Sequence, residues 1–438
     1  MAEQISEPLR PARKPVRLIP SQIDKESITS QPKARDSPLK RVRRDLQTCL
    51  QLLPKLPNIF QPLRARRPTD ELYLGKRNVV NLAGLVLVSL LEVVLLLFSC
   101  LSTLLLPGAI SYWICLLNLR IASWTCAPFH GPTIYHAGLG PYNAREAMGE
   151  EHWIFINGVV VTSYGLEQNC RQLAQTFRRP ITGIQNRTYG LVGDLLECII
   201  QRTFSYNTYD ARVAYDHLKK VLVDPRIRKV ILICHSQGAI VASLVLDMLF
   251  ADLSVKQMQK LEIYTFGSAA EHISNPLCST GKGGVIKHIE HYVNKNDPIP
   301  QWGVLRNIDD VENRYAGRVF IREDGRGHLF NQHYLSQMFP LEGETASSKA
   351  NFLNQPVHVD EGITEARRLL VHKKTGGLSP KDSSNPSGTG ARGAIGFLTG
   401  LPVREVSRLC QYMGGREPEA SASNGEILKC SIRSSNSL

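Results

Sequence analysis

The sequence predicts a mixed α/β domain with a mainly parallel sheet, preceded by a membrane-inserted helical segment and flanked by disordered tails. Three observations lead to this expectation. Short apolar runs alternate with helical patterns over residues 151–340, one apolar stretch is long enough to cross a bilayer, and both ends are rich in Pro, Ser, Lys and Arg. Strands that alternate with helices favour a parallel sheet covered on both faces.

The positive charge of the chain is concentrated at its N-terminal end. The net charge is +13, and residues 1–77 carry 17 of the 52 Lys and Arg but only 8 of the 39 Asp and Glu. A folded nucleic-acid module concentrates basic residues beside groove-reading elements, whereas a basic tail suits an anionic membrane surface. We therefore expect residues 1–77 to form a disordered basic arm, with room for a short amphipathic helix around 39–53, and no nucleic-acid partner. The same charge distribution fits a disordered tail without a specific role equally well.

The long apolar stretch covers residues 79–106 and contains a single charge, Glu92. About 20 residues suffice for a helix to cross a bilayer core. Pro107 and Gly108 interrupt the stretch before a second one, 109–119. We expect residues 78–120 to insert into a membrane, as one span or as a hairpin. The alternative is a buried core helix, but such helices rarely run this long without a polar face.

The two topologies differ in where they place the domain. Basic residues before the apolar stretch favour a cytosolic N-terminus. A single span puts the domain across the membrane from the basic arm, whereas a hairpin keeps both on one side. An intracellular endomembrane is the expected location, and the oligomeric state is left open.

The rest of the chain divides into a connector (121–150), the α/β domain (151–372) and a disordered C-terminal tail (373–438). The ten cysteines are scattered singly without metal-ligand spacing, so we expect no disulfide framework, no metal and no cofactor. The patterns in the domain predict strands at 153–156, 229–234, 261–266 and 288–293, and helices at 166–177, 191–202, 209–223 and 237–250.

The most informative segment begins with the apolar strand 229–234. It runs directly into His235-Ser236-Gln237-Gly238, and an Ala- and Val-rich helix follows. This is the context of a nucleophile elbow, a sharp strand-to-helix turn that exposes a serine above the sheet. Cys234 stands where the first glycine of G-x-S-x-G is expected. A polar strand-to-helix turn in another kind of α/β domain therefore remains an alternative.

A serine nucleophile needs a base, and the base needs an acidic residue that orients it. Asp297 follows the predicted strand 288–293, at the edge where open α/β sheets place their sites. Further along, His328 and His333 are two candidate bases. His328 follows a glycine on an expected loop, whereas His333 falls in a short helix that begins near Asn331, so we favour His328.

These segments together resemble the class 3 lipase branch of the α/β-hydrolases and membrane-linked serine hydrolases of that kind. The motifs that carry the resemblance are the elbow, Thr265-Phe266-Gly267-Ser268, Asn294-x-x-Asp297-Pro-x-Pro and a late histidine, over residues 150–340. The resemblance implies an α/β-hydrolase fold with Ser236 as nucleophile, Asp297 as orienting acid and His328 as base, with His333 as the alternative base. Asn157-Gly158 departs from the His-Gly of many relatives.

The end of the first predicted strand is where an oxyanion donor is expected. The backbone N–H groups of Val159 and Gln237 would form the pair, unless Asn157-Gly158 is only a tight turn. The sequence thus predicts a membrane-anchored serine hydrolase, a lipase or esterase that cleaves a lipid or other acyl ester. Two alternatives remain: an inactive hydrolase-fold tether or binding module, and an enzyme for a protein-bound thioester or a soluble ester.

Overall fold

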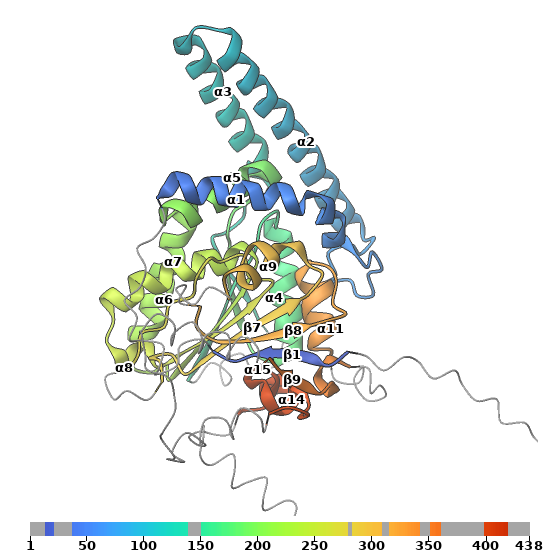
Figure 1. The fold of residues 1–438 in the computed structure, drawn as a ribbon, viewed down its shortest axis with the longest axis vertical. Coiled ribbons are helices and arrows are strands. Elements are labelled where there is room, and N and C mark those ends of the chain that lie inside the picture. Colours follow the sequence, from blue (N-terminus) through green and yellow to red (C-terminus); the bar gives the residue numbers. More distant parts are fainter. Residues whose placement is uncertain are drawn as a thin grey trace, which may run out of the picture.

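The computed structural model describes residues 14–21, 37–138, 150–278, 283–308, 315–341, 351–360 and 398–418. Within these residues nine strands form one sheet, in the order β2-β4-β3-β5-β6-β7-β8-β1-β9 (Figure 1). Neighbouring strands from β4 to β8 are parallel, whereas β2 and β1 join the two sides of this block antiparallel. The mixed α/β architecture with a mainly parallel sheet is confirmed.

All four strands predicted from the sequence are present, as β3, β5, β6 and β7. The others were not predicted, and most of them have four residues or fewer. The strands are β1 (Val16–Ile19), β2 (Ile134–Ala137), β3 (Glu151–Ile156), β4 (Ile181–Ile184), β5 (Lys229–His235), β6 (Leu261–Phe266), β7 (His288–Asn294), β8 (Arg318–Arg322) and β9 (Val357–Val359).

All four predicted helices of the domain are also present, as α4, α5, α6 and α7. Each bound lies within a few residues of the expected one. The helices are α1 (Pro38–Leu52), η2 (Leu53–Phe60), α2 (Lys76–Leu105), α3 (Gly108–Cys126), η3 (Ala127–Phe129), α4 (Ser163–Phe177), α5 (Gly190–Phe204), α6 (Tyr209–Val223), α7 (Gln237–Asp252), α8 (Val255–Met258), α9 (Pro298–Trp302), α10 (Val304–Asn307), η4 (Phe330–Leu335), α11 (Ser336–Met338), η5 (Phe352–Asn354), α14 (Val403–Val406), α15 (Arg408–Gln411) and η7 (Met413–Gly415).

The sheet has a hydrophobic core on each face, because successive strand residues point to opposite sides. On β3, Ile154 and Ile156 belong to one core, which α5, α6 and α7 cover. Trp153 and Phe155 belong to the other, which α4, α11 and the segment 398–418 cover. The central strands are thus buried on both faces, as expected for a parallel sheet.

The prediction that residues 1–77 form a disordered arm is wrong for the part the structure describes. β1 lies in the sheet between β8 and β9, and its Val16 and Leu18 are almost completely buried. A four-residue strand is too short to show a period in sequence, and pairing with its neighbours stabilises it. The helix that the sequence allowed around 39–53 is present as α1, which packs against α5.

Two further boundaries differ from the prediction. The connector 121–150 contains the end of α3 and the strand β2, which pairs with β4. The C-terminal tail 373–438 is not wholly disordered, because residues 398–418 pack on the sheet with Val403 and Leu409 buried. The Arg408 guanidinium pairs with Glu262 of β6 there. The remaining parts of that tail lie outside the described residues.

α2 and α3 form an antiparallel hairpin that projects from one end of the domain (Figure 1). Polar side chains join the two helices: Asn118 Nδ2 donates to Ser99 Oγ at 2.8 Å, and Ser111 Oγ donates to the Ser102 carbonyl at 2.7 Å. In the described chain α2 is the one helix long and apolar enough to cross a membrane. The most apolar stretch of 18 residues in α2 has a mean hydropathy of 2.6, and 17% of that stretch is buried.

Candidate active site

Ser236 lies at the turn between β5 and α7 in a backbone conformation that few residues adopt. Its φ is 54° and its ψ is −119°. Such strain at a non-glycine residue is typical of a functional turn, and it is the geometry that a nucleophile elbow requires. Close approach of the helix explains Gly238, because a Cβ there would lie 2.3 Å from the Ile156 carbonyl oxygen. The elbow therefore forms without the first glycine of the usual motif.

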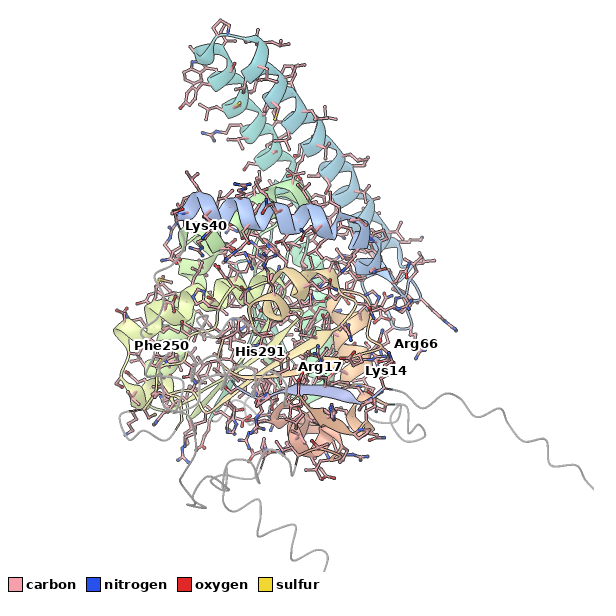
Figure 2. The ribbon with its side chains drawn as sticks, in the orientation of Figure 1. Lys14, Arg17, Lys40, Arg66, Phe250 and His291 are labelled. Atoms are coloured by element: carbon pink, nitrogen blue, oxygen red, sulfur yellow. The ribbon has the colours of Figure 1, made fainter. Side chains whose placement is uncertain are left out.

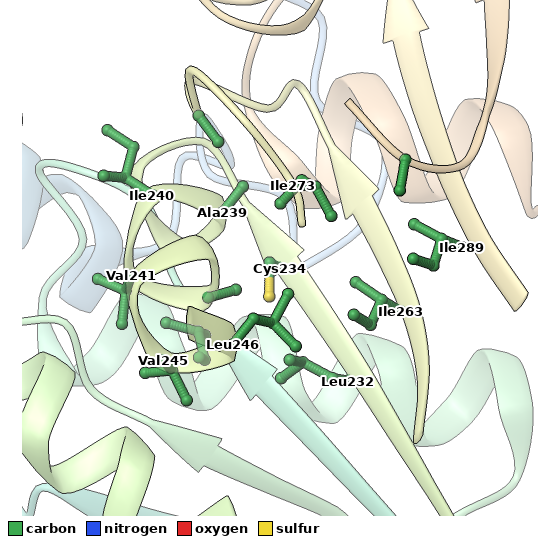
Figure 3. Packing of buried hydrophobic residues seen from close by; sticks show 14 of the residues in the cluster. Leu232, Cys234, Ala239, Ile240, Val241, Val245, Leu246, Ile263, Ile273 and Ile289 are labelled. Carbon is green, nitrogen blue, oxygen red and sulfur yellow. The ribbon is translucent and has the colours of Figure 1, made fainter. Parts of the chain in front are cut away.

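Cys234 occupies the position of that missing glycine. Its side chain is completely buried among Leu232, Ala239 and Leu246, in the core between β5 and α7 (Figure 3). Burial raises the pKa of the Cys234 thiol far above its ordinary value, so the group stays neutral. The residue acts as a small hydrophobe in the core.

The elbow lies where the strand order reverses. From β3 the chain passes to β4 on one side, and it returns as β5 on the other side of β3. Ligands of open α/β sheets bind at such a switch point, beyond the carboxyl ends of the strands. Gly158, which follows β3, touches the elbow directly, because a Cβ there would lie 2.6 Å from Ser236 Cβ.

Asp297 and His328 form a buried pair at the same edge of the sheet. Asp297 caps α9 after β7, and its Oδ1 accepts from the Ile299 N–H at 2.9 Å. His328 Nδ1 donates to Asp297 Oδ2 at 2.6 Å, and the Tyr334 hydroxyl donates to the same oxygen at 2.6 Å. A neutral imidazole that donates from Nδ1 keeps Nε2 as an acceptor. Nε2 of His328 is buried and has no partner among the described residues.

Contacts with the elbow place His328 next to Ser236. The Ser236 N–H donates to the Phe266 carbonyl at 3.0 Å, and a Cβ on the adjacent Gly267 would lie 3.0 Å from His328 Cε1. The His235 ring lies 4.6 Å from the His328 ring, centroid to centroid, and His235 Nε2 donates to the His328 carbonyl at 2.8 Å. Ser236 Oγ and His328 Nε2 are not hydrogen-bonded to each other in this structure. The three predicted residues thus come together.

The other candidate base, His333, has both ring nitrogens engaged. Nδ1 accepts from the Leu329 N–H at 3.1 Å, and Nε2 donates to the Pro62 carbonyl at 2.9 Å. The ring lies in η4, within the short helix that the sequence predicted, and is completely buried. These bonds fix its tautomer and hold the loop after His328, and they leave no nitrogen for a reacting group.

The turn after β3 is held by a buried carboxylate. Val160 has a φ of 56°, which is costly for a β-branched residue. Its N–H donates to Asp194 Oδ2 at 2.7 Å, and Asp194 also accepts from the Tyr189 N–H at 2.6 Å. Burial raises the pKa of Asp194 to about 7. The neighbouring backbone N–H groups of Val159 and Gln237 make no hydrogen bond within the described chain, so both can donate to a ligand.

Asn157 does more than form a tight turn. Its Oδ1 accepts from the Asn186 N–H at 2.9 Å, which ties the end of β3 to the end of β4. Asn186 Nδ2 donates to Gln237 Oε1 at 2.6 Å, and Gln237 Nε2 donates to Glu197 of α5 at 3.0 Å. Burial raises the pKa of Glu197 to about 7. This chain of side-chain amides fixes the two candidate oxyanion donors relative to each other.

Three residues of the site were not predicted from the sequence: Tyr334, Asp194 and Asn186. None lies in one of the hydrolase motifs. Tyr334 follows the second candidate histidine directly, and only the fold shows that it reaches Asp297. Asp194 offered a signal, because it is the one charged residue in the apolar stretch 190–196. Such a residue is often buried with backbone partners.

No group of three or more His, Cys, Asp and Glu side chains in the described ranges is arranged to hold a metal ion. No family model and no curated protein matches the chain. Solved structures that resemble it include two of an esterase from the archaeon Pyrobaculum calidifontis. Each is 14% identical with a TM-score of 0.25; the monoclinic form covers 47% of this chain and 80% of its own, and the other covers 46% and 81%.

A bacterial heroin esterase is similar to the same extent. It is 10% identical, has a TM-score of 0.25, and covers 47% of this chain and 81% of its own. Likenesses with such a TM-score carry no argument about this protein. The evidence on the chemistry of this protein is therefore the geometry around Ser236.

Proposed function

We propose that the protein is a serine hydrolase with an α/β-hydrolase fold that cleaves an acyl ester. One observation carries the proposal. The buried Asp297–His328 pair lies beside the strained elbow of Ser236, with His328 Nε2 as an unpartnered acceptor. A base that is oriented by a carboxylate and has a vacant nitrogen next to a serine is the arrangement that activates a hydroxyl.

The reaction follows from these positions. His328 Nε2 takes the proton of Ser236 Oγ as that oxygen bonds to the carbonyl carbon of the ester, and the C=O π electrons move to the carbonyl oxygen. The N–H groups of Val159 and Gln237 donate to this oxyanion. When the C–O bond breaks, the His328 imidazolium protonates the departing alcohol. Water then attacks the acyl-serine in the same way, which releases the acid and restores Ser236.

We further propose that the α2–α3 hairpin inserts into an intracellular membrane and that the substrate is a lipid or another acyl ester held there. The exposed apolar surface of α2 supports this, since little of its most apolar window is buried. A hairpin returns the chain to the side where it entered. The domain and the segment before α2 would therefore lie on one side of the membrane.

The first test is fluorophosphonate labelling of the detergent-solubilised protein. The reagent forms a covalent bond with an activated serine and requires no knowledge of the substrate. We expect labelling of the wild type and none of Ser236→Ala. Asp297→Asn and His328→Ala should reduce the labelling rate by about 10³-fold or more, since triad members act together.

His333→Gln is the matched control, because glutamine can still donate to the Pro62 carbonyl. It should retain most of the labelling, since His333 has no vacant nitrogen in the structure. If a folded wild type does not label, the serine hydrolase proposal fails and an inactive membrane tether becomes the better account. If labelling requires His333 and not His328, the assignment of the base is wrong.

A further inference from the structure

The most exposed side chains of helix α5 are all apolar. Five of its residues are exposed, and none of them is polar or charged. A helix on the surface of a soluble domain normally presents polar residues to water. The outer face of α5 is therefore suited to an apolar environment. The five residues are Leu191, Leu195, Leu196, Ile200 and Phe204.

Helix α1 also differs from an ordinary surface helix, because polar side chains face the domain and leucines face outward. Its polar residues Arg41, Asp45 and Thr48 are buried against the domain. Arg41 donates to the Thr203 carbonyl at 2.6 Å, and Asp45 pairs with Arg202 at 3.0 Å. The outer face of α1 carries leucines, basic residues and two glutamines, with no carboxylate. Its exposed residues include Leu39, Lys40, Arg43, Leu46, Gln47, Leu50 and Gln51.

These faces lie together at the end of the molecule from which the hairpin projects. α1 and α5 pack against each other at the base of α2 and α3 (Figure 1), and Lys40 marks one end of α1 (Figure 2). In the described chain, every exposed large apolar side chain except Val223 and Val255 lies within 39–124 or 191–209. An apolar surface concentrated on one part of a molecule marks an interaction site.

We infer that α1 and α5 lie in the headgroup layer of an anionic phospholipid bilayer, and that together with the hairpin they form one membrane-binding surface. The inference rests on the proposed membrane anchoring. Interfacial helices place Leu and Phe in the acyl boundary and Lys and Arg among the headgroups, which is the pattern of α1 and α5. The continuity of this surface with the hairpin favours a bilayer over a second copy of the chain.

The inference also gives the candidate site an orientation. Asp194 and Glu197, on the inner side of α5, hold the Val160 turn and the Gln237 side chain. The helix whose outer face would touch lipid thus supports the candidate oxyanion donors with its inner face. To reach Ser236, an ester in the bilayer would therefore have to cross only the layer formed by α1 and α5.

The test uses the full chain in phosphatidylcholine–phosphatidylserine vesicles that contain a trace of phospholipid with a diazirine near the glycerol end of its acyl chain. After illumination, lipid adducts are mapped by peptide mass spectrometry. We expect adducts in α1 and α5 as well as in the hairpin, and reduced α1 adducts when phosphatidylserine is omitted. Fluorophosphonate labelling of the same samples reports separately on the proposed chemistry.

Leu46→Glu with Leu50→Glu should abolish the adducts of α1 and leave those of the hairpin. Val223→Glu with Val255→Glu, at exposed valines elsewhere, is the matched control and should change nothing. Adducts confined to the hairpin would overturn the inference while leaving the anchor in place. Protein–protein crosslinks between the α1 faces of two chains, in place of lipid adducts, would overturn it in favour of a dimer.

Discussion

Cys234 is the residue at which this chain departs from the G-x-S-x-G motif of a nucleophile elbow. The disagreement is resolved by the direction of the side chain, which lies in the core below α7 and is fully buried. The close contact that demands a glycine occurs instead at Gly238, against the Ile156 carbonyl oxygen. The strained φ of Ser236 therefore does not depend on a glycine at position 234.

We accordingly predict that Cys234→Ala lowers stability without removing the reactivity of Ser236. Loss of the sulfur leaves a small core cavity, which costs about 1 kcal/mol of the free energy of unfolding. Cys170→Ala, at a fully buried cysteine on the other face of the sheet, is the control and should cost about as much. Urea unfolding in detergent and the fluorophosphonate rate measure the two effects. A variant of unchanged stability that no longer labels would contradict this account.

At the scale of elements, the single charge of the apolar stretch joins α2 to α5. Glu92 is buried, and its Oε2 accepts from the Val192 N–H at 3.1 Å, in the first turn of α5. Ser89 Oγ accepts from the Leu191 N–H at 3.3 Å. Two side chains of the hairpin thus cap the N-terminus of α5. Asp194, which accepts from the Val160 N–H, follows two residues after Val192.

Loss of this cap should affect both stability and reactivity. We predict that Glu92→Ala lowers the free energy of unfolding by about 1–2 kcal/mol, as loss of an N-cap does, and slows fluorophosphonate labelling. Glu92→Gln keeps one oxygen that accepts from the backbone and should retain most of the labelling rate. Val94→Ala, at an exposed position two residues on, is the control. Labelling that is equally fast in Glu92→Ala and the wild type would disprove the coupling.

The elements that the sequence predicted are those with a strong period or a long apolar run. β5 and α7 belong to this group, and so does the hairpin region around α2. β1 and β2 could not be predicted, because four residues are too few to show an alternation of apolar and polar residues. Their stability comes from pairing with β8 and β4. The order Ser, Asp, His was visible in the sequence, which also favoured His328 over His333. The hydrogen bonds of the two rings, which only the fold shows, support that choice.

Across the whole molecule, the segment between α1 and α2 joins the candidate site to the proposed membrane surface. The Ile59 carbonyl accepts from the His328 N–H at 2.9 Å, and the Pro62 carbonyl accepts from His333. The Glu71 carboxylate accepts from the Asn331 N–H at 2.7 Å. The chain before the hairpin, expected to be a free arm, is thus part of the structure that holds the histidine loop. The proposed membrane-binding surface, the histidine loop and the sheet therefore form one unit.

The stability of this unit should depend on pH through its buried histidines. His291 of β7 (Figure 2) is completely buried, and burial lowers its pKa to about 4. In the unfolded chain histidine titrates near 6.5, so between about pH 4 and 6.5 only the unfolded state binds this proton, and the free energy of unfolding rises with pH by about 3 kcal/mol. Asp194 and Glu197, whose pKa values burial raises to about 7, contribute with the opposite sign, so the quantity to follow is the difference in the free energy of unfolding between the wild type and His291→Gln. Chemical unfolding at several pH values should show this difference increase by that amount between about pH 4 and 6.5. His358→Gln, at an exposed residue of β9, should leave the pH dependence unchanged. Parallel curves for His291→Gln and the wild type would show that His291 does not set the dependence.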